Sequence, residues 1–487
     1  MSIHWPILKQ LFASRRRVVV VDDKREYTGA MLLGAAMHVA AAVKGRCESR
    51  TIGVLTPTSA GFPICALAGW ILGKTVVPLN YLLKREELQY VIDDCGCDTI
   101  LTVQPMLDFM GYEPAVKNIV KLESIEFKGM PDPTWPASAE DSDLGVLLYT
   151  SGTSGKPKGV MLSHGNITAN IGQVLGWVPL SHNDSVLGVL PQFHSFGMTV
   201  LTLLPLTHGM RAVYTARFVP GKIVKLLREH RPTIFVAIPS MYNALLHAKD
   251  ARAEDFAGVR YLVSGGEPLP QAVFDGYRDR FGVTINEGYG LTETSPITNW
   301  CRPEEWRPRS VGAALPGLEQ RIADPATGRA LAPGREGEVQ MRGPNVMQGY
   351  FRLPEQTRAV FTDDGFFKTG DMGRQDDDGH LFITGRIKEM LIIGGENVFP
   401  REIEEVLNKH PSIKESGVVG QMDPMRGEQP VAFVELREGA TLDETVLKTW
   451  CRESLAGYKV PSSIRAVEAL PRNATGKIMR RELKKMV

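Results

Sequence analysis

A run of small and hydroxylic residues between positions 149 and 159 is the strongest local sign of chemistry in this chain. It reads Tyr-Thr-Ser-Gly-Thr-Ser-Gly-Lys-Pro-Lys-Gly and follows an apolar stretch, Leu144–Tyr149, that predicts a buried strand. Small residues let backbone N–H groups converge on an anion, while hydroxyls add donors and lysines add positive charge. We therefore predict a polyphosphate-binding loop made of Thr150, Ser151, Gly152, Thr153, Ser154, Gly155 and Lys156.

This loop is not the Walker loop of P-loop ATPases and kinases. Only two residues separate Gly152 from Gly155, and Pro157 follows Lys156. A Walker loop has four residues between its glycines and a Ser or Thr after its lysine. A solvated surface loop is the alternative interpretation of such a run. The strand before the loop and the lysines within it favour phosphate binding.

The elements that must position this loop follow an alternating pattern. Short β-rich apolar runs alternate with helical stretches, which is typical of an α/β protein with parallel sheets. After about residue 310 short strands dominate, and residues 386–487 form a compact α+β pattern. We predict an N-terminal domain over 1–386 and a C-terminal domain over 387–487. The expected strands of the first part are Val18–Val21, Ile52–Leu55, Thr75–Leu79, Ser185–Leu190, Ile234–Ile238, Tyr261–Val263 and Val283–Asn286.

Composition limits the classes of function. The 487 residues carry 56 Lys plus Arg against 55 Asp plus Glu, a formal net charge of +1, which gives no support for bulk nucleic-acid binding. Six scattered cysteines suggest reduced thiols in a cytoplasmic protein. Neither a secretion signal nor a transmembrane segment is expected. An opening helix with Phe12 and then Arg15–Arg17 leaves peripheral membrane contact open.

Five motifs in order along the chain resemble those of the acyl-adenylate-forming (AMP-binding) enzymes, closest to fatty acyl-CoA and acyl-carrier-protein synthetases. The first is the loop already described. The others are Tyr289-Gly-Leu-Thr-Glu-Thr, Lys368-Thr-Gly-Asp, Gly385-Arg-Ile-Lys with Gly394-Gly-Glu-Asn, and Pro471-Arg-Asn-Ala-Thr-Gly-Lys. The resemblance extends from about residue 145 to the end of the chain. It implies a large N-terminal domain of α/β subdomains with a β-rich subdomain, followed by a small mobile C-terminal α+β domain.

The resemblance implies a nucleotide site. Glu293 would be the Mg²⁺ ligand, and Thr292 would touch the α-phosphate. A hard oxygen ligand suits Mg²⁺, which keeps waters and substrate phosphates in its coordination shell. Asp371 would accept the ribose hydroxyls, and Arg386 would hold the ribose or phosphate side. The adenine pocket would be formed by Gly265, Gly266, Glu267, Gly288, Tyr289 and Gly290.

Three further residues receive roles from the same resemblance. Lys477 would bridge the carboxylate and the α-phosphate as charge builds, and such preorganised donors contribute ~3–4 kcal/mol. His194 would lie between the acid pocket and the thiol tunnel and would position substrate. Lys388 would be the hinge about which the C-terminal domain rotates between two half-reactions.

The implied activity is ATP-dependent ligation of a carboxylic acid to a thiol through an acyl-AMP intermediate. A fatty acid is the first choice of substrate, with aryl or short-chain acids as the alternative. Coenzyme A is the expected acceptor, and the phosphopantetheine of a separate carrier protein stays open. Two rival hypotheses are an adenylating enzyme with another acceptor and a non-catalytic nucleotide-binding protein.

Overall fold

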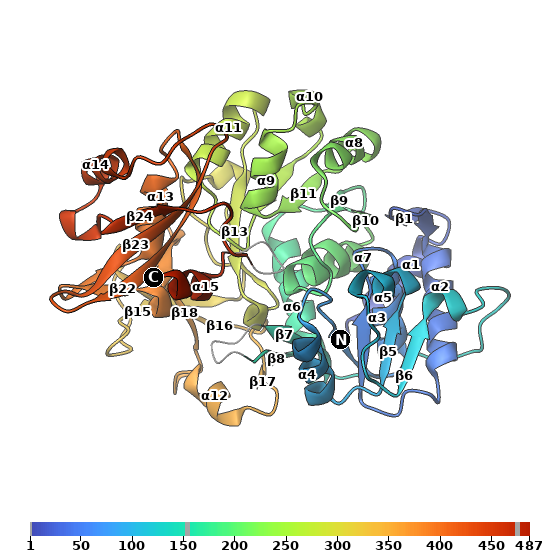
Figure 1. The fold of residues 1–487 in the computed structure, drawn as a ribbon. Coiled ribbons are helices and arrows are strands. Elements are labelled where there is room, and N and C mark those ends of the chain that lie inside the picture. Colours follow the sequence, from blue (N-terminus) through green and yellow to red (C-terminus); the bar gives the residue numbers. More distant parts are fainter. Residues whose placement is uncertain (1, 151–155, 473–477) are drawn as a thin grey trace.

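Two large parallel-containing sheets form the body of the protein (Figure 1). The computed structural model describes residues 2–150, 156–472 and 478–487. The seven-stranded sheet has the order β17 (Gly349–Tyr350), β8 (Lys158–Ser163), β7 (Leu144–Thr150), β4 (Thr75–Pro78), β3 (Thr51–Leu55), β5 (Thr99–Thr102) and β6 (Asn118–Lys121). The eight-stranded sheet has the order β14 (Ile297–Trp300), β13 (Asn286–Gly290), β12 (Tyr261–Ser264), β11 (Ile234–Ala237), β9 (Ser185–Gly188), β10 (Arg211–Tyr214), β1 (Val18–Val21) and β2 (Glu26–Thr28).

Helices separate and cover these two sheets. Between them lie α1 (His4–Ala13), α2 (Gly29–Val43), α3 (Gly61–Ile71) and α6 (His164–Trp177), whose apolar faces join both sheets in the largest core. The outer face of the seven-stranded sheet packs against α4 (Arg85–Cys95) and α5 (Gln104–Met110). The outer face of the eight-stranded sheet packs against α8 (Pro220–His230), α9 (Pro239–Leu246), α10 (Ala253–Phe256) and α11 (Gln271–Phe281). Parallel strands are apolar on both sides because helices cover both faces.

Two smaller sheets complete the chain. A four-stranded antiparallel sheet contains β15 (Glu319–Ala323), β16 (Glu336–Arg342), β18 (Phe367–Gln375) and β19 (Leu381–Arg386), with α12 (Pro354–Ala359) preceding β18. The C-terminal unit contains β20 (Leu391–Ile393), β21 (Glu396–Val398), β22 (Ile413–Asp423), β23 (Gly427–Leu436) and β24 (Ser463–Ala466), with α13 (Pro400–Leu407), α14 (Glu444–Ser454) and α15 (Arg480–Leu483). This α+β unit has its own apolar core. The α/β architecture predicted from the sequence is therefore confirmed.

One expected strand was misplaced. The sequence predicted a strand at Val283–Asn286, but β13 begins at Asn286 and extends to Gly290. The shift arises because Gly282 ends α11 in the left-handed conformation, with a φ of +68°, and the next residues carry the chain back to the sheet edge. The strand therefore contains the Gly288-Tyr289-Gly290 segment itself.

The opening helix α1 and the six cysteines are the features from which the sequence analysis predicts where the protein resides. Ile7, Leu8 and Leu11 of α1 are buried in the core, whereas Phe12 is 66% exposed. All six cysteines are buried free thiols. Over the described residues, no helix combines the length and apolar character needed to cross a membrane. Membrane-surface contact through α1 stays a prediction.

A buried histidine pair makes the fold sensitive to acid. His4 of α1 and His164 of α6 lie with ring centroids 6.1 Å apart, and the His164 Nδ1 accepts a hydrogen bond from the Ile3 N–H. Burial, and secondarily the neighbouring His4, lowers the pKa of His164 from 6.5 to about 4. Burial also lowers the pKa of His4. The folded state therefore excludes protons that the unfolded chain accepts.

We predict that the melting temperature falls as the pH drops from about 6.5 toward 4. Stability is complete above the unfolded pKa and is lost as pH falls toward the lower folded pKa. The shift of His164 corresponds to about 3 kcal/mol. Thermal melts of His164→Gln should show a shallower pH dependence than the wild type. His247→Gln, at an exposed position, serves as the control, and an equal flattening in both variants would contradict the assignment.

Candidate active site

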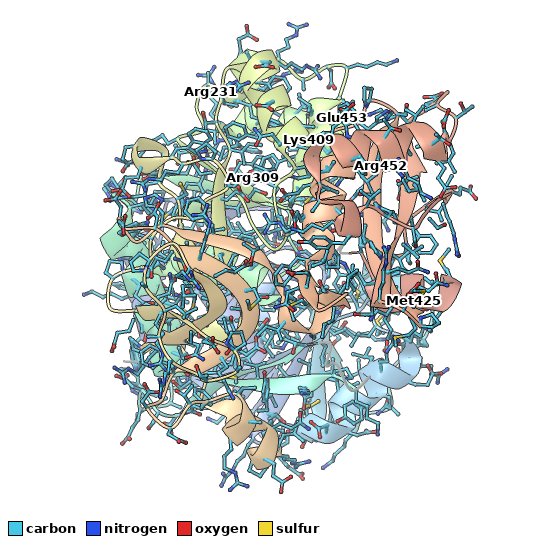
Figure 2. All side chains as sticks on the ribbon, turned by 90° about the vertical axis from the view of Figure 1, so that its left-hand side faces the viewer. Arg231, Arg309, Lys409, Met425, Arg452 and Glu453 are labelled. Carbon is cyan, nitrogen blue, oxygen red and sulfur yellow. The ribbon has the colours of Figure 1, made fainter. Side chains whose placement is uncertain are left out.

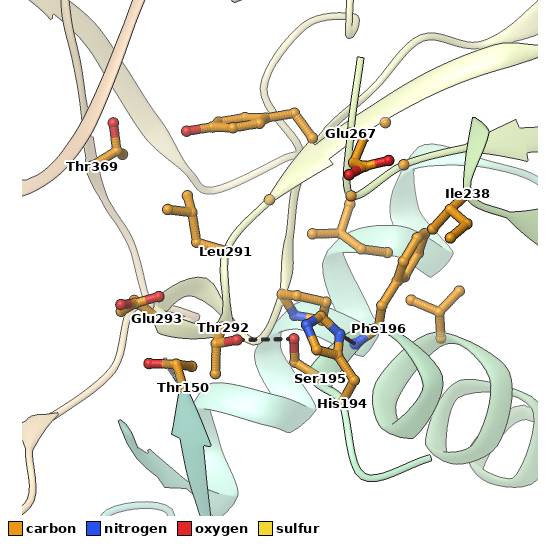
Figure 3. A pocket seen from close by; sticks show the side chains of 18 of the residues that line it. Thr150, His194, Ser195, Phe196, Ile238, Glu267, Leu291, Thr292, Glu293 and Thr369 are labelled. Atoms are coloured by element: carbon orange, nitrogen blue, oxygen red, sulfur yellow. Dashed lines mark hydrogen bonds between the residues drawn. The ribbon is translucent and has the colours of Figure 1, made fainter. Parts of the chain in front are cut away.

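A cavity of about 1080 Å³ opens where the carboxyl ends of several strands meet (Figure 3). Its walls come from β7, β8, β11, β12, β13, β18 and β19, and from the π-helix Phe196–Leu203. Open α/β sheets bind ligands at this edge because connecting loops there leave a crevice. A π-helical turn within a helix is rare and is often found at functional sites.

The cavity's polar part gathers three groups that the sequence singled out. Thr150 ends β7, and the side chains of Thr292 and Glu293 project from a short helical turn after β13 (Figure 3). The Ser195 and Thr292 hydroxyls lie 3.2 Å apart. Lys158, paired with Thr150 across the β7–β8 hairpin, also lines this wall. Cationic, hydroxyl and carboxylate groups thus face a common space, a set that is compatible with a metal-bound triphosphate.

The glycine-rich loop is described only at its ends. Ser151, Gly152, Thr153, Ser154 and Gly155 lie outside the described residues, so their predicted phosphate contacts stay predictions. The Lys156 ammonium lies over the Tyr90 ring, 5.2 Å from its centroid, and does not line the cavity. Lys158, the other lysine of the run, lines the cavity instead.

A smaller crevice of about 230 Å³ continues from the cavity between the N-terminal body and the C-terminal unit. The walls shared by both spaces contain Gly266, Glu267, Gly288, Tyr289, Gly290 and Arg386. Val311 and Ile383 supply apolar surface to the crevice, and Asp371 lies at its edge. Apolar surface beside a buried carboxylate makes this crevice a candidate adenosine slot, with Asp371 as the predicted ribose partner.

Two positions of the site require glycine because neighbouring atoms leave no room for a Cβ. A Cβ on Gly290 would lie 1.9 Å from the Pro296 carbonyl oxygen, and one on Gly265 would lie 3.0 Å from the Phe196 ring. Neither neighbour can retreat cheaply, because one is backbone and the other is a packed ring. The bare backbone at these two positions therefore shapes the slot.

Asp371 lies at the centre of a buried network. It is 3% exposed, and its carboxylate accepts a 2.5 Å hydrogen bond from the Tyr289 hydroxyl and pairs with Arg386 Nε at 2.8 Å. Asp371 also raises the pKa of Arg386. Each carboxylate oxygen has two lone pairs, so both keep one for a ribose hydroxyl.

His194 lies at the mouth of the apolar part of the cavity (Figure 3). Its Nδ1 accepts a hydrogen bond from the Phe196 N–H at 3.3 Å. The ring thus stands at the start of the π-helix, between Thr292 and the apolar wall. The role of His194 as a gate between the acid pocket and the thiol tunnel stays a prediction.

Beyond His194 the wall is apolar. The residues that α6, β9, the π-helix, β11, α9, β12 and β14 contribute to it include no charged side chain among those described, and Ser240 is the main polar group. The apolar residues are Val174, Leu180, Val186, Leu190, Val200, Leu204, Phe218, Ile234, Val236, Ile238, Met241, Ala244, Val263, Ile297 and Trp300. Within the described residues, such a wall offers no partner for an ionised group.

The C-terminal unit reaches this site with the segment that flanks Lys477. Lys477 itself lies outside the described residues. On either side of it, Arg472 and Ile478 pair as an isolated β-bridge, and Ile478 and Arg480 line the crevice opposite Glu267. Arg480 pairs with Glu389 at 3.0 Å and with Glu404 at 2.7 Å. These ion pairs thus hold Arg480, on the C-terminal side of Lys477, next to the candidate adenosine slot.

Lys388 follows the last strand of the N-terminal body. β19 ends at Arg386, and the next sheet begins at Leu391. Lys388 lines the cavity, where burial and then the adjacent Arg386 lower the pKa of its ammonium. Its location between two sheets suits a hinge, which stays a prediction.

Several site residues were not found from the sequence. Tyr350 and Glu338 line the polar part of the cavity, and Val311 and Ile383 line the crevice. Glu287 also lines the crevice, where burial raises the pKa of its carboxyl. Their isolated residue types carry no signal. Only Gly349-Tyr350, a glycine before an aromatic near the third motif, offered one.

Comparison with known proteins agrees with this geometry. Residues 9–351 match the AMP-binding enzyme family, and residues 402–477 match the AMP-binding enzyme C-terminal domain. This chain belongs to the AMP-binding enzyme family. It is 38% identical over 356 residues to the long-chain-fatty-acid–CoA ligase of Bacillus subtilis (strain 168), covering 72% of this chain and 63% of that protein. It is 33% identical over 417 residues to a feruloyl-CoA synthase of Amycolatopsis sp., covering 85% and 84%.

Solved structures also match this AMP-binding enzyme over nearly its whole length. The ATP-bound crystal structure of MatB from Rhodopseudomonas palustris matches with a TM-score of 0.90, at 29% identity over 100% of this chain and 99% of that one. The apo structure of the same protein, with the same identity and coverage, gives 0.80. The o-succinylbenzoate coenzyme A synthetase (MenE) of Bacillus subtilis with ATP and a magnesium ion gives 0.86 at 28% identity, over 98% and 99%. The fold of this chain thus matches that of the ATP-bound MatB more closely than that of the apo structure.

An ion pair crosses the border between the units. Arg309 of the N-terminal body, labelled at this border in Figure 2, pairs with Glu405 of α13 at 2.5 Å. Arg401, also on α13, donates to the Ile383 carbonyl on β19 and pairs with Glu405. These contacts tie α13 to the body beside the crevice and stabilise this arrangement.

We predict that Arg309→Gln raises the rate of tryptic cleavage between residues 386 and 390. Loss of the pair with Glu405 should raise it by up to about fivefold, the factor for about 1 kcal/mol. Arg307→Gln is the matched control, because Arg307 pairs with Asp376 and Asp378 within the N-terminal body. Combining Arg309→Glu with Glu405→Arg should restore slow cleavage. Equal acceleration in the Arg307 variant would contradict the assignment.

Proposed function

We propose that this protein is an ATP-dependent acid–thiol ligase that activates a fatty acid as acyl-AMP and transfers the acyl group to coenzyme A. One observation carries the proposal. A single cavity has metal- and phosphate-compatible groups at one end and a long apolar wall at the other, with His194 between them. The acid's carboxylate would then meet the α-phosphate where the two ends join.

The first half-reaction forms a bond between a carboxylate oxygen and the α-phosphorus, while the bond to the β-phosphate bridge breaks and pyrophosphate leaves. Positioning and charge stabilisation account for most of the rate in phosphoryl chemistry. Thr292 and Lys158 face the phosphates, Asp371 and Arg386 orient the ribose, and Lys477 would neutralise the developing charge. In the second half-reaction the thiol sulfur attacks the acyl carbon, AMP leaves, and the thiol proton passes to solvent.

The residues present fit a magnesium ion. Glu293 supplies one carboxylate to the cavity, and no cluster of three or more metal-binding side chains exists among the described residues. Mg²⁺ suits such a site because it takes most of its ligands from water and substrate phosphates. Bound there, it would balance the charge of the leaving pyrophosphate.

The substrate assignment follows from the cavity wall. A dicarboxylic or sulfonated acid would place a second anion against apolar side chains, which costs several kcal/mol without a partner. The fatty acid is favoured over an aryl acid by the extent of the apolar wall, from Ile238 and Met241 to Phe218 and Trp300. An aryl acid is the second candidate, since the feruloyl-CoA synthase is a close match over most of both chains.

Coenzyme A is the proposed acceptor, and the cytoplasm is the proposed location. The chain's matches to CoA ligases favour coenzyme A, and a carrier protein would present the same phosphopantetheine thiol. Six free, buried thiols support a reducing compartment such as the cytoplasm.

We predict acid-dependent pyrophosphate release with Mg-ATP across a panel of fatty, aryl and short acids, and steady turnover only when coenzyme A is added. Fatty acids should give the highest kcat/KM. Ala244→Phe, which adds a ring to the apolar wall, should lower kcat/KM for long acids by about fivefold or more, because overpacking typically costs about 1–3 kcal/mol. It should leave short acids within about threefold. If no acid in the panel caused pyrophosphate release, or if short acids were preferred, the substrate assignment would be rejected.

We predict that Lys388→Pro slows thioester formation more than adenylation. Proline fixes φ and would restrict a backbone change at the hinge. Adenylation is measured as pyrophosphate exchange, and thioester formation as transfer from isolated acyl-AMP to coenzyme A. Lys388→Ala is the control, since it removes the ammonium and keeps the backbone free. Equal losses in both half-reactions for the proline variant would count against a hinge.

A further inference from the structure

Tyr350 connects the candidate metal ligand to the strand that leaves the glycine-rich loop. Its hydroxyl donates a hydrogen bond of 2.9 Å to Glu293 Oε1. The ring is 8% exposed, and both side chains line the cavity. This bond occupies one carboxylate oxygen of Glu293, so the other can face the cavity.

The position of the Tyr350 hydroxyl is fixed by its backbone. Strand β17 pairs with β8, with Tyr350 opposite Val160, and the Tyr350 N–H donates to Thr357 Oγ1 at 2.8 Å. The preceding Gly349 has a φ of +139°, and a Cβ there would lie 2.5 Å from the Thr357 side chain. Glycine at this position lets β17 pair with β8 while α12 packs against β17. Tyr350 therefore cannot move without disturbing β8.

The electrostatic surroundings keep Tyr350 a donor. Burial, and secondarily the Glu293 carboxylate, raises the pKa of its hydroxyl far above its ordinary value. The ring also holds the Lys158 ammonium, 5.2 Å from its centroid. One side chain thus orients both a carboxylate for a metal ion and a cation for phosphate.

We infer that Tyr350 is a positioning residue for the metal–nucleotide complex, acting through the orientation of Glu293. This inference rests on the proposed function, since it assigns Glu293 to the metal. A hydrogen bond to a charged group that is lost from a buried site lowers binding by about tenfold or more. Here the loss should fall on metal-dependent affinity, because the Tyr350 hydroxyl bonds the candidate metal ligand, whereas the Tyr289 hydroxyl bonds the candidate ribose partner.

The test measures ATP binding to the full-length protein by calorimetry, with free Mg²⁺ varied from micromolar to millimolar. In Tyr350→Phe the Mg²⁺ concentration for half-maximal ATP affinity should rise about tenfold. Tyr289→Phe is the comparison variant. Its hydroxyl bonds Asp371, so it should weaken ATP by a similar factor at every Mg²⁺ concentration. An unchanged Mg²⁺ dependence in Tyr350→Phe would overturn the inference.

A double-mutant cycle separates positioning from general destabilisation. Adding Tyr350→Phe to Glu293→Gln should change the Mg²⁺ dependence by less than about twofold, since the carboxylate it orients is already gone. Additive effects would mean that Tyr350 acts independently of Glu293. Because this readout needs no acid or thiol, a wild-type protein that binds Mg-ATP but releases no pyrophosphate with any acid would reject the proposed function and still test Tyr350.

Discussion

The buried carboxylate of Asp371 is the point on which the rest of the site depends. It accepts from Tyr289 on the eight-stranded sheet and pairs with Arg386, the last residue of β19. Removing either partner would leave a buried charge incompletely satisfied, which is far more costly than never having buried it. The network thus joins a large sheet, the small antiparallel sheet and the start of the C-terminal unit at one place, where we expect the ribose.

Around this network, the backbone of two glycines lies in close contact with neighbouring residues. The Gly290 backbone passes against the Pro296 carbonyl, and Gly265 passes against the Phe196 ring, which begins the π-helix. The polar and apolar ends of the cavity are therefore connected through these close backbone contacts. The wall that would hold the acid is fixed by the same elements that shape the nucleotide slot, so an acyl-adenylate that spans both ends meets a rigid surface.

The C-terminal unit adds a variable part to this fixed surface. Its α13 is held by Arg309 and Arg401, and its Arg480 pairs with Glu389 next to Lys388. Most of these pairs are partly exposed, and such pairs contribute little each. Weak contacts of this kind are compatible with the proposed hinge at Lys388.

The sequence by itself determined the α/β architecture, the family and the order of its motifs, because strand periodicity and glycine-rich loops are local properties of the chain. It also named Thr292, Glu293, Asp371, Arg386 and His194, which the structure brings to the cavity or the adjoining crevice. Only the tertiary structure decided that Lys158 rather than Lys156 faces the cavity, that β13 contains Gly288–Gly290, and that Tyr350 orients Glu293. Those facts depend on which distant strands pair and on which side a single residue points, and no local pattern encodes either.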